Sequence, residues 1–424
     1  MNRIILIGNG FDLAHGMKTS YNDFINDYWS NTILSILEIK ESSFENLEIK
    51  ITEISSLLSL YLSKNKSYQD LVEGLEKTKG KMVFKNKFLE QINEKKQIQN
   101  WVDIENEYYL LLKKAFKDEN CTYKISQLNS DFTEIQKLLE NYLKKIETNF
   151  RNDFGNDESD VNLKISIGNK VYSQFKLKDF TEASINKKVD SEYLEIKDDL
   201  KAINSGIVNM KDINEKKQNL ISAIGKSDPR TIIRKRLLSE TATNYFNLQP
   251  AEILFLNFNY TFTEILYNNL TWFELINVGK NLEKSVIHIH GTTDPKDNNN
   301  VIFGFGDEID EDYKSIENLN DNIFLENIKS IKYFETDNYK KLLEFLNSGD
   351  YQIFIFGHSC GNSDRTLLST LFEHKNCVSI KPFYYKREKD DNYSEIVRNI
   401  TRNFSNKAVL RDKVVNKEYC EPLT

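Results

Sequence analysis

Residues 4–16 read IILIGNGFDLAHG, and this stretch decides the fold of the chain. The four-residue apolar run predicts a buried β-strand, and the glycine-rich segment directly after it predicts a tight turn. Gly8 and Gly10 let the main chain bring bare N–H groups up to a phosphate that larger side chains would keep away. The chain therefore begins with a candidate nucleotide-binding loop, although Leu13 stands where the dinucleotide fingerprint has a third glycine.

The order of strand, polar loop and amphipathic helix returns in the C-terminal part of the chain. Apolar runs at 253–256, 286–290, 352–356 and 378–385 each predict a further strand. This alternation predicts an α/β fold with a Rossmann-like parallel sheet. In such a sheet the loops after the carboxyl ends of the strands converge on one crevice, so residues far apart in the sequence are expected to meet there.

Residues 31–250 differ in composition from the two flanks. Glycine and proline are sparser there, and helical spacing is clear over 101–116. We therefore expect 1–30 to supply the first strand, nucleotide loop and helix of the sheet domain, 31–250 to form a mostly helical insertion, and 251–424 to supply the rest of the sheet domain. Short runs of alternating apolar and polar residues over 161–171 are also compatible with a small hairpin within the insertion.

Composition limits the class of protein. The 424 residues are 39% hydrophobic, which is ample material for a core. The formal net charge of −7 argues against a surface built for nucleic acid, and we interpret the basic segment 230–236 as a solvated helix face. The cysteines show no metal-ligand spacing, and no apolar run approaches the roughly twenty residues that cross a bilayer. We expect a globular cytoplasmic protein that does not engage membranes, with self-association left open.

Four of the five histidines lie in or beside the predicted strand-end loops. Histidine titrates near neutral pH and therefore suits proton transfer. His290, at the end of its predicted strand, is the candidate general base. His288 points to the same strand face two residues earlier. For His288, and for the loop residues His15 and His358, a role in the site and a bracing role in the fold both stay open.

Asn259 is the second candidate catalytic residue. Its amide offers a donor and an acceptor, so it can hold a ribose hydroxyl or a water without adding charge. The alternative is a turn-forming asparagine that bonds to its own backbone. The following residues predict a helix start, with Thr261 as the cap and Glu264 as its partner.

Five segments carry a resemblance to a known family. They are GNGFDLAHG at 8–16, WVDIE at 101–105, NFNYT at 257–261, HIHG at 288–291, and GHS with Asp364 at 357–364. Over nearly its whole length, and in this order, the chain resembles the AbiH family of bacteriophage abortive-infection proteins. That family is in turn distantly similar to the sirtuin-like NAD-consuming fold. The resemblance implies an antiphage effector that hydrolyses NAD as its substrate and requires no cofactor.

The resemblance also implies a role for each matched position. Asn259 corresponds to the catalytic asparagine and His290 to the general base. The residues expected to bind the nucleotide are Gly8, Asn9, Gly10, Phe11, Asp12, His15, Gly357, His358, Ser359 and Asp364. Thr261 stands where sirtuin-like enzymes commonly have an aspartate, and the four-cysteine zinc ribbon of the deacylases is absent. Hydrolysis of NAD, rather than protein deacylation, is therefore the expected activity, and no metal site is implied.

A serine hydrolase is a competing interpretation. The segment GHSCG at 357–361 lies between a predicted strand and a predicted helix, as the nucleophile-elbow motif requires. A catalytic triad needs a histidine later in the chain, and His374 is the only one. It follows Ser359 by 15 residues, within or just after the elbow helix, where a triad histidine is not expected.

A metal-dependent nuclease or phosphoesterase toxin is a second alternative. His288 and His290 with Asp294, Asp307 and His358 have side chains that bind divalent metals. Against this alternative, the first strand ends in glycines and an asparagine rather than in an acidic ligand.

A third alternative is a nucleotide-binding regulator without turnover. In that case the helical insertion would bind a partner, such as a phage-derived trigger, and the sheet would only sense a ligand. We expect Trp101 to pack the insertion against the sheet. Glu105 either reaches the pocket or faces solvent, as an acidic residue on a helix usually does.

Overall fold

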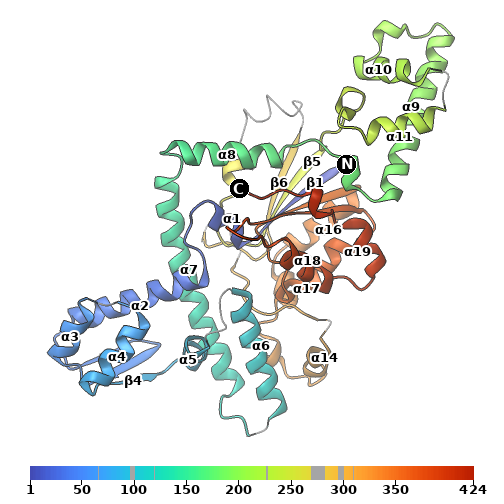
Figure 1. Ribbon diagram of the computed structural model, residues 1–424. Helices are drawn as coiled ribbons and strands as arrows, with labels where there is room; N and C mark the ends of the chain where they lie inside the picture. Colours follow the sequence, from blue (N-terminus) through green and yellow to red (C-terminus); the bar gives the residue numbers. More distant parts are fainter. Residues whose placement is uncertain are drawn as a thin grey trace.

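The computed structural model describes residues 1–64, 66–95, 101–118, 120–225, 228–268, 282–294, 300–308 and 310–424. A five-stranded sheet in the order β6-β5-β1-β7-β8 forms its centre, and every neighbouring pair is parallel (Figure 1). The strands are β1 (Asn2–Ile7), β5 (Glu252–Asn257), β6 (Glu283–His288), β7 (Tyr351–Phe356) and β8 (Cys377–Phe383). The prediction of a parallel α/β sheet is confirmed.

The strand order places a crevice at one edge of the sheet. From the central strand β1 the chain adds β5 and β6 on one side, and then crosses to add β7 and β8 on the other. Numbered along the chain, the strands read 3-2-1-4-5, which is the order of the first five strands in doubly wound nucleotide-binding sheets. The order reverses between β1 and β7, so the loops after these two strands border the crevice where such sheets bind ligands.

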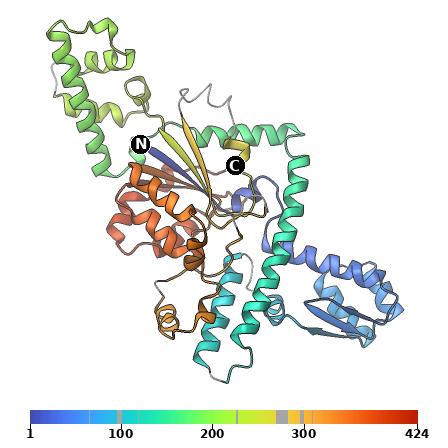
Figure 2. The ribbon, with the colours of Figure 1, turned by 180° about the vertical axis from the view of Figure 1, so that it is seen from behind.

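Helices cover both faces of the sheet (Figures 1 and 2). Because successive strand residues point to opposite faces, Ile4 and Leu6 pack into one helical layer, and Ile5 and Ile7 pack into the other. The first layer contains α16 (Asn338–Ser348), α17 (Arg365–Glu373) and α18 (Tyr393–Arg402), and the second contains α1 (Asn9–Ala14), α8 (Glu158–Val171) and α12 (Ile265–Asn268). Burial on both faces explains why residues 4–7 of β1 are an unbroken apolar run.

Most of the remaining helices lie between α1 and β5 in the chain. They are α2 (Tyr21–Glu38), α3 (Ser56–Leu62), α4 (Tyr68–Thr78), α5 (Lys87–Glu94), α6 (Trp101–Lys117), α7 (Ile125–Asp153), α9 (Glu182–Asn204), α10 (Glu215–Ile224) and α11 (Pro229–Leu237). Figures 1 and 2 show two lobes on opposite sides of the central sheet, one built on α2 to α4 and one on α9 to α11. After β6 come α14 (Glu311–Glu317) and α15 (Lys329–Lys332), and α19 (Lys407–Lys413) follows α18. The assignment of 31–250 to an insertion domain stays a prediction.

Three local features were not predicted by the sequence analysis. The α2 to α4 lobe contains an antiparallel sheet of β2 (Ser43–Glu45), β3 (Ile49–Thr52) and β4 (Lys81–Phe84), which the sequence analysis did not predict. Residues 161–171 belong to α8 rather than to a hairpin, since their buried side chains Ile167 and Val171 are spaced for a helix. Strand β6 ends at His288, which places His290 in the loop beyond it.

The helix predicted from Thr261 onwards begins only at Ile265. The Thr261 hydroxyl donates to the Asp12 carboxylate at 2.6 Å, and Glu264 accepts from the Asn257 side chain at 2.7 Å. Both side chains are therefore engaged by buried polar groups and do not form the predicted cap.

Candidate functional site

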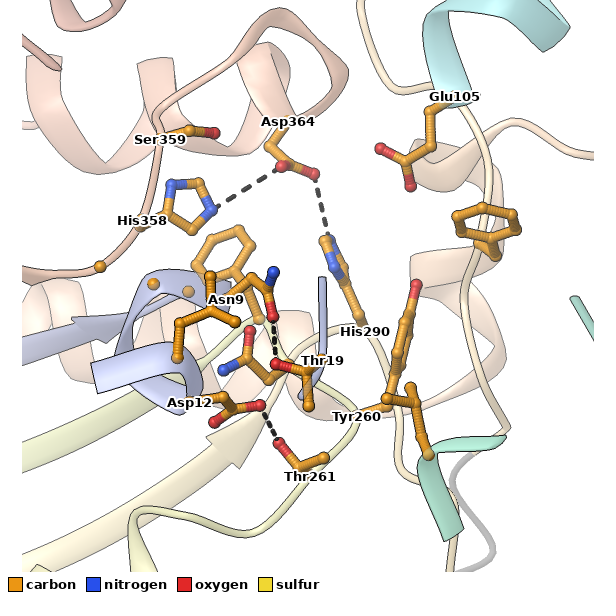
Figure 3. A pocket seen from close by; sticks show the side chains of 18 of the residues that line it. Asn9, Asp12, Thr19, Glu105, Tyr260, Thr261, His290, His358, Ser359 and Asp364 are labelled. Carbon is orange, nitrogen blue, oxygen red and sulfur yellow. Dashed lines mark hydrogen bonds and ion pairs between the residues drawn. The ribbon is translucent and has the colours of Figure 1, made fainter. Parts of the chain in front are cut away.

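A cavity of about 280 Å³ lies at the carboxyl edge of the sheet, among the loops that follow β1, β5, β6 and β7 (Figure 3). Its wall contains both predicted catalytic residues, Asn259 and His290. It also contains most of the predicted nucleotide-binding residues, namely Gly8, Asn9, Gly10, Asp12, Gly357, His358, Ser359 and Asp364. Phe11 and His15 do not line it. Further lining residues that the sequence analysis did not select are Leu13, Thr19, Leu143, Phe258, Tyr260, Thr261, Phe303 and Lys329.

The two glycine loops touch each other beneath the cavity. The Gly10 N–H donates to the Gly357 carbonyl at 2.9 Å, so the amide that we predicted to face a phosphate bonds the neighbouring loop. Gly357 has a φ of +71°, and a Cβ added to it would lie 2.1 Å from the Phe11 nitrogen. In this structure the glycines are therefore required for the close approach of the loops after β1 and β7.

Gly357→Ala is expected to destabilise the protein. The positive φ alone costs an L-residue about 1–2 kcal/mol, and the contact with Phe11 adds to that cost. Gly349→Ala is the matched control, because no atom would lie within 4 Å of the added Cβ. Urea unfolding of the two variants should show a lower midpoint for Gly357→Ala only, and equal midpoints would show that the close approach is unimportant.

His290 is buried against an acid. Its Nε2 lies 3.2 Å from Asp364 Oδ1 and 3.2 Å from the Tyr333 hydroxyl. Burial, and then the nearby Lys329 ammonium, lower the pKa of His290, while Asp364 acts in the opposite direction. Since the ordinary pKa of histidine is about 6.5, the ring is neutral at physiological pH and is able to accept a proton.

Asp364 contacts a second histidine through its other oxygen. The Nε2 of His358 lies 3.7 Å from Asp364 Oδ2, and its Nδ1 accepts the Cys360 N–H at 2.9 Å (Figure 3). Because Nδ1 accepts a hydrogen bond, the proton of the neutral ring must sit on Nε2, facing the carboxylate. Burial lowers the pKa of His358 to about 4, so this ring also stays neutral.

Lys329 is the charged cavity residue that sequence reasoning missed. Its Nζ lies 2.8 Å from Asp364 Oδ1 and 2.8 Å from Glu105 Oε1, and its side chain is 2% exposed. Lysine is almost never fully buried unless it is paired, and nothing in its sequence neighbourhood indicates such a pairing. The contact also settles the position of Glu105, which reaches the cavity from α6 rather than facing solvent. The side chain of Trp101 lies outside the described residues.

The ammonium of Lys329 lies between two carboxyl groups, those of Glu105 and Asp364. Burial opposes the ionisation of Asp364, but Lys329 and His290 outweigh it and hold the pKa of Asp364 below its ordinary value. Burial is the larger influence on Glu105 and raises its pKa despite Lys329. Asp364 is therefore the ionised partner, and Glu105 is the carboxyl that gains a proton more readily.

Asn259 presents an unpartnered amide at the cavity wall. Its backbone N–H donates to Asn257 Oδ1 at 2.8 Å, which fixes the loop. Its side-chain Nδ2 is buried and makes no hydrogen bond of normal geometry with any described residue, although the amide lies beside Asp12 and lowers the pKa of that carboxyl. Leaving a buried donor unpaired costs about 1–3 kcal/mol, so this group is poised for a ligand or a water.

Asp12 braces the same wall. Its two oxygens accept the Thr261 and Thr263 hydroxyls, each at 2.6 Å. Burial raises the pKa of Asp12 to about 6, although these hydrogen bonds favour its ionised form. Asn9, on the opposite side of the loop, accepts the Thr19 hydroxyl at 2.7 Å (Figure 3).

Two of the candidate histidines lie in the surrounding framework. His288 Nε2 is 3.0 Å from Glu264 Oε1, and Glu264 also accepts from Asn257, the residue that holds the Asn259 backbone. His15 bonds the Phe11 carbonyl at 2.7 Å and the Tyr267 hydroxyl at 2.6 Å, and burial lowers its pKa to about 4. Neither lines the cavity, and both contacts fit the bracing role that was left open.

The metal alternative needs its five residues in one place. The structure instead pairs His288 with Glu264, joins Asp307 to Arg365 at 3.2 Å, and directs His290 and His358 onto Asp364. Over the described ranges, no group of three or more His, Cys, Asp or Glu side chains is arranged to hold a metal ion.

The serine-hydrolase alternative needs a strained nucleophile and a nearby histidine. Within the segment, positive φ angles fall at Gly357 and Cys360, on either side of Ser359, and not at Ser359 itself. His374 is the residue after the last turn of α17, and its ring stacks on Tyr351 rather than lining the cavity. The segment therefore lacks the geometry of a nucleophile elbow.

Comparison with known proteins gives one match. The family model described as "Bacteriophage abortive infection AbiH" matches residues 4–386. No curated protein and no solved structure matches the chain. Within the described ranges, the helices lack the combination of length and apolar character that a membrane crossing needs. Because the family match extends from β1 through β8, the chain belongs to the AbiH family of bacteriophage abortive-infection proteins, which points to a role in antiphage defence.

Proposed function

We propose that this protein acts in abortive infection by hydrolysing NAD at the bond between nicotinamide and ribose. The observation that carries the proposal is the meeting of two groups in one buried cavity. His290 is a neutral base held by Asp364, and Asn259 has an unpartnered amide at the same wall. The strand order supports the proposal, because the cavity lies where doubly wound sheets bind nucleotides.

The proposed reaction breaks one bond and forms one. The C1′–N bond of the nicotinamide riboside breaks, and its electron pair neutralises the pyridinium nitrogen, so nicotinamide leaves uncharged. Water then attacks C1′ and loses its proton to His290, which gives ADP-ribose. The side chain of Asn259 holds the ribose hydroxyls or the attacking water, and Asp364 stabilises the histidine once it carries the proton.

The size of the cavity limits how NAD would lie. Small-molecule pockets commonly measure about 300–1,000 Å³, and this one, at about 280 Å³, lies just below that range. We therefore assign the nicotinamide riboside end of NAD to the cavity beside Asn259 and His290. The diphosphate and adenosine would lie towards the exposed Ser359 at the mouth.

The direct test is incubation of the purified protein with NAD, followed by chromatography of the products. Hydrolysis predicts nicotinamide and ADP-ribose in equal amounts. Binding of NAD without product would contradict the proposal and would favour the nucleotide-binding regulator instead. Release that is lost with a chelator and restored by a divalent metal would support metal-dependent chemistry.

Asn259→Ala is expected to lower the hydrolysis rate about 10²-fold to 10³-fold, as loss of one oriented polar group at a reacting centre commonly does. Its stability should fall little, because the Nδ2 that is removed makes no hydrogen bond of normal geometry with any described residue. Asn31→Ala, on the exposed surface of α2, is the matched control. Unchanged hydrolysis in Asn259→Ala would remove this residue from the mechanism.

A further inference from the structure

Four buried titratable side chains lie in a continuous row of contacts beside the cavity. Glu105 comes from α6, Lys329 from the first turn of α15, Asp364 from the short 3-10 turn before α17, and His290 from the loop after β6. Successive contacts along it measure 2.8 Å, 2.8 Å and 3.2 Å. Each side chain is no more than 6% exposed, so water screens these interactions weakly.

The order of charges along this row of side chains determines how tightly His290 holds a proton. Asp364 attracts a proton onto His290, while the Lys329 ammonium repels it. Glu105 offsets Lys329 when it is ionised, because its carboxylate then lies as close to the ammonium as Asp364 does. Burial raises the pKa of Glu105, so this compensation is lost as the pH falls. Glu105 therefore acts on His290 through Lys329, without touching it.

The other groups that face His290 have no charge to contribute. They are the Tyr333 hydroxyl, the Phe258 ring and backbone carbonyl, the Tyr260 ring and the ring of His358. Burial raises the pKa of Tyr333 and of Tyr260 well above the ordinary value, so both hydroxyls keep their protons. Among the described residues that line the cavity, Lys329 is the one permanent cation.

We propose that Lys329 and Glu105 are positioning residues that set the proton affinity of His290 through Asp364, so that helix α6 of the 31–250 region controls the base of the reaction. The inference rests on the proposed function only in treating His290 as that base. A movement of α6 that withdrew Glu105 would leave Lys329 less compensated and His290 a weaker base. The same helix would then couple an event elsewhere in the 31–250 region to activity.

The test is an NMR titration of the histidine rings in the full-length protein without NAD, with the His290 signals assigned by their absence in a His290→Gln variant. Glu105→Gln should not raise the pKa of His290, and should lower it wherever the Glu105 carboxyl of the wild type is ionised, because Lys329 then loses half of its compensation. Glu105→Gln combined with Lys329→Met should raise it by about one pH unit or more, because Asp364 is then the only charged neighbour. Glu344→Gln and Lys340→Met, on the exposed face of α16, are the matched controls.

A higher pKa of His290 in the double variant, without a rise in Glu105→Gln, supports the inference, and a merely structural pair would not produce it. No rise in the double variant, or a rise in both variants, would overturn it. If the double variant fails to fold, the Glu105→Gln titration decides, since the glutamine still offers an oxygen to Lys329: a rise in the pKa of His290 would overturn the inference, and its absence would support it. The acid limb of kcat should move with the pKa of His290. If the titrations behave as expected but the protein releases no nicotinamide, the proposed function fails and the inference about the charges stands.

Discussion

His290→Ala is expected to reduce NAD hydrolysis by about 10²-fold to 10⁴-fold, the usual contribution of a general acid or base. His290 combines a lowered pKa with a carboxylate partner at 3.2 Å and a place in the cavity wall. The alanine variant keeps the other lining residues, so binding of NAD should weaken less than turnover does. Steady-state release of nicotinamide separates the two effects as kcat and KM.

His374→Ala is the matched control for this variant, because His374 lies after α17 and outside the cavity. It should hydrolyse NAD at the rate of the wild-type protein. The wild-type pH profile adds a second check. Because the pKa of His290 lies below the ordinary value of about 6.5, kcat/KM should fall only as the pH drops below that value. Normal hydrolysis by His290→Ala would show that another group is the base.

Lys329→Met is expected to destabilise the protein by about 3–5 kcal/mol, the range found when one partner of a buried ion pair is removed. The substitution leaves the Glu105 and Asp364 carboxyls buried beside each other without their shared ammonium. One of the two must then take up a proton or draw one onto His290. The loss should therefore be larger at pH 8 than at pH 5, where protonation relieves the repulsion.

Urea unfolding at the two pH values measures this loss. Lys340→Met, an exposed lysine on α16, should change stability by less than about 0.5 kcal/mol. Adding Glu105→Gln to Lys329→Met should recover part of the loss, because one of the two opposed charges is gone. Equal midpoints for Lys329→Met and Lys340→Met would show that the buried cluster contributes little to stability.

The architecture of the sheet could be predicted from the sequence. The three central strands, β5, β1 and β7, are buried on both faces, so each one contains an apolar run with a polar loop behind it. Parallel strands bring those loops to one edge. This reasoning was sufficient to predict that residues spread over most of the chain lie close together. The structure places four of them at the wall of one cavity, namely Gly8, Asn259, His290 and Gly357.

The residues that complete the cavity depend on contacts that periodicity does not encode. Lys329 carries the least expected role, because its burial depends on two carboxylates that come from other elements. Glu105 looks like an ordinary helical acid until that contact is known. Likewise, Thr261 and Glu264 have the pattern of a helix cap, but their side chains hydrogen-bond to buried partners outside the helix.

The measurement that tests the central claim most directly is the NAD content of intact cells during phage challenge. Cells that carry the wild-type protein should lose NAD after infection, and cells that carry His290→Ala at the same protein level should keep it. His374→Ala should behave as the wild type does. An equal loss of NAD with and without a functional His290, or no loss in either case while wild-type cells still resist the phage, would contradict the account.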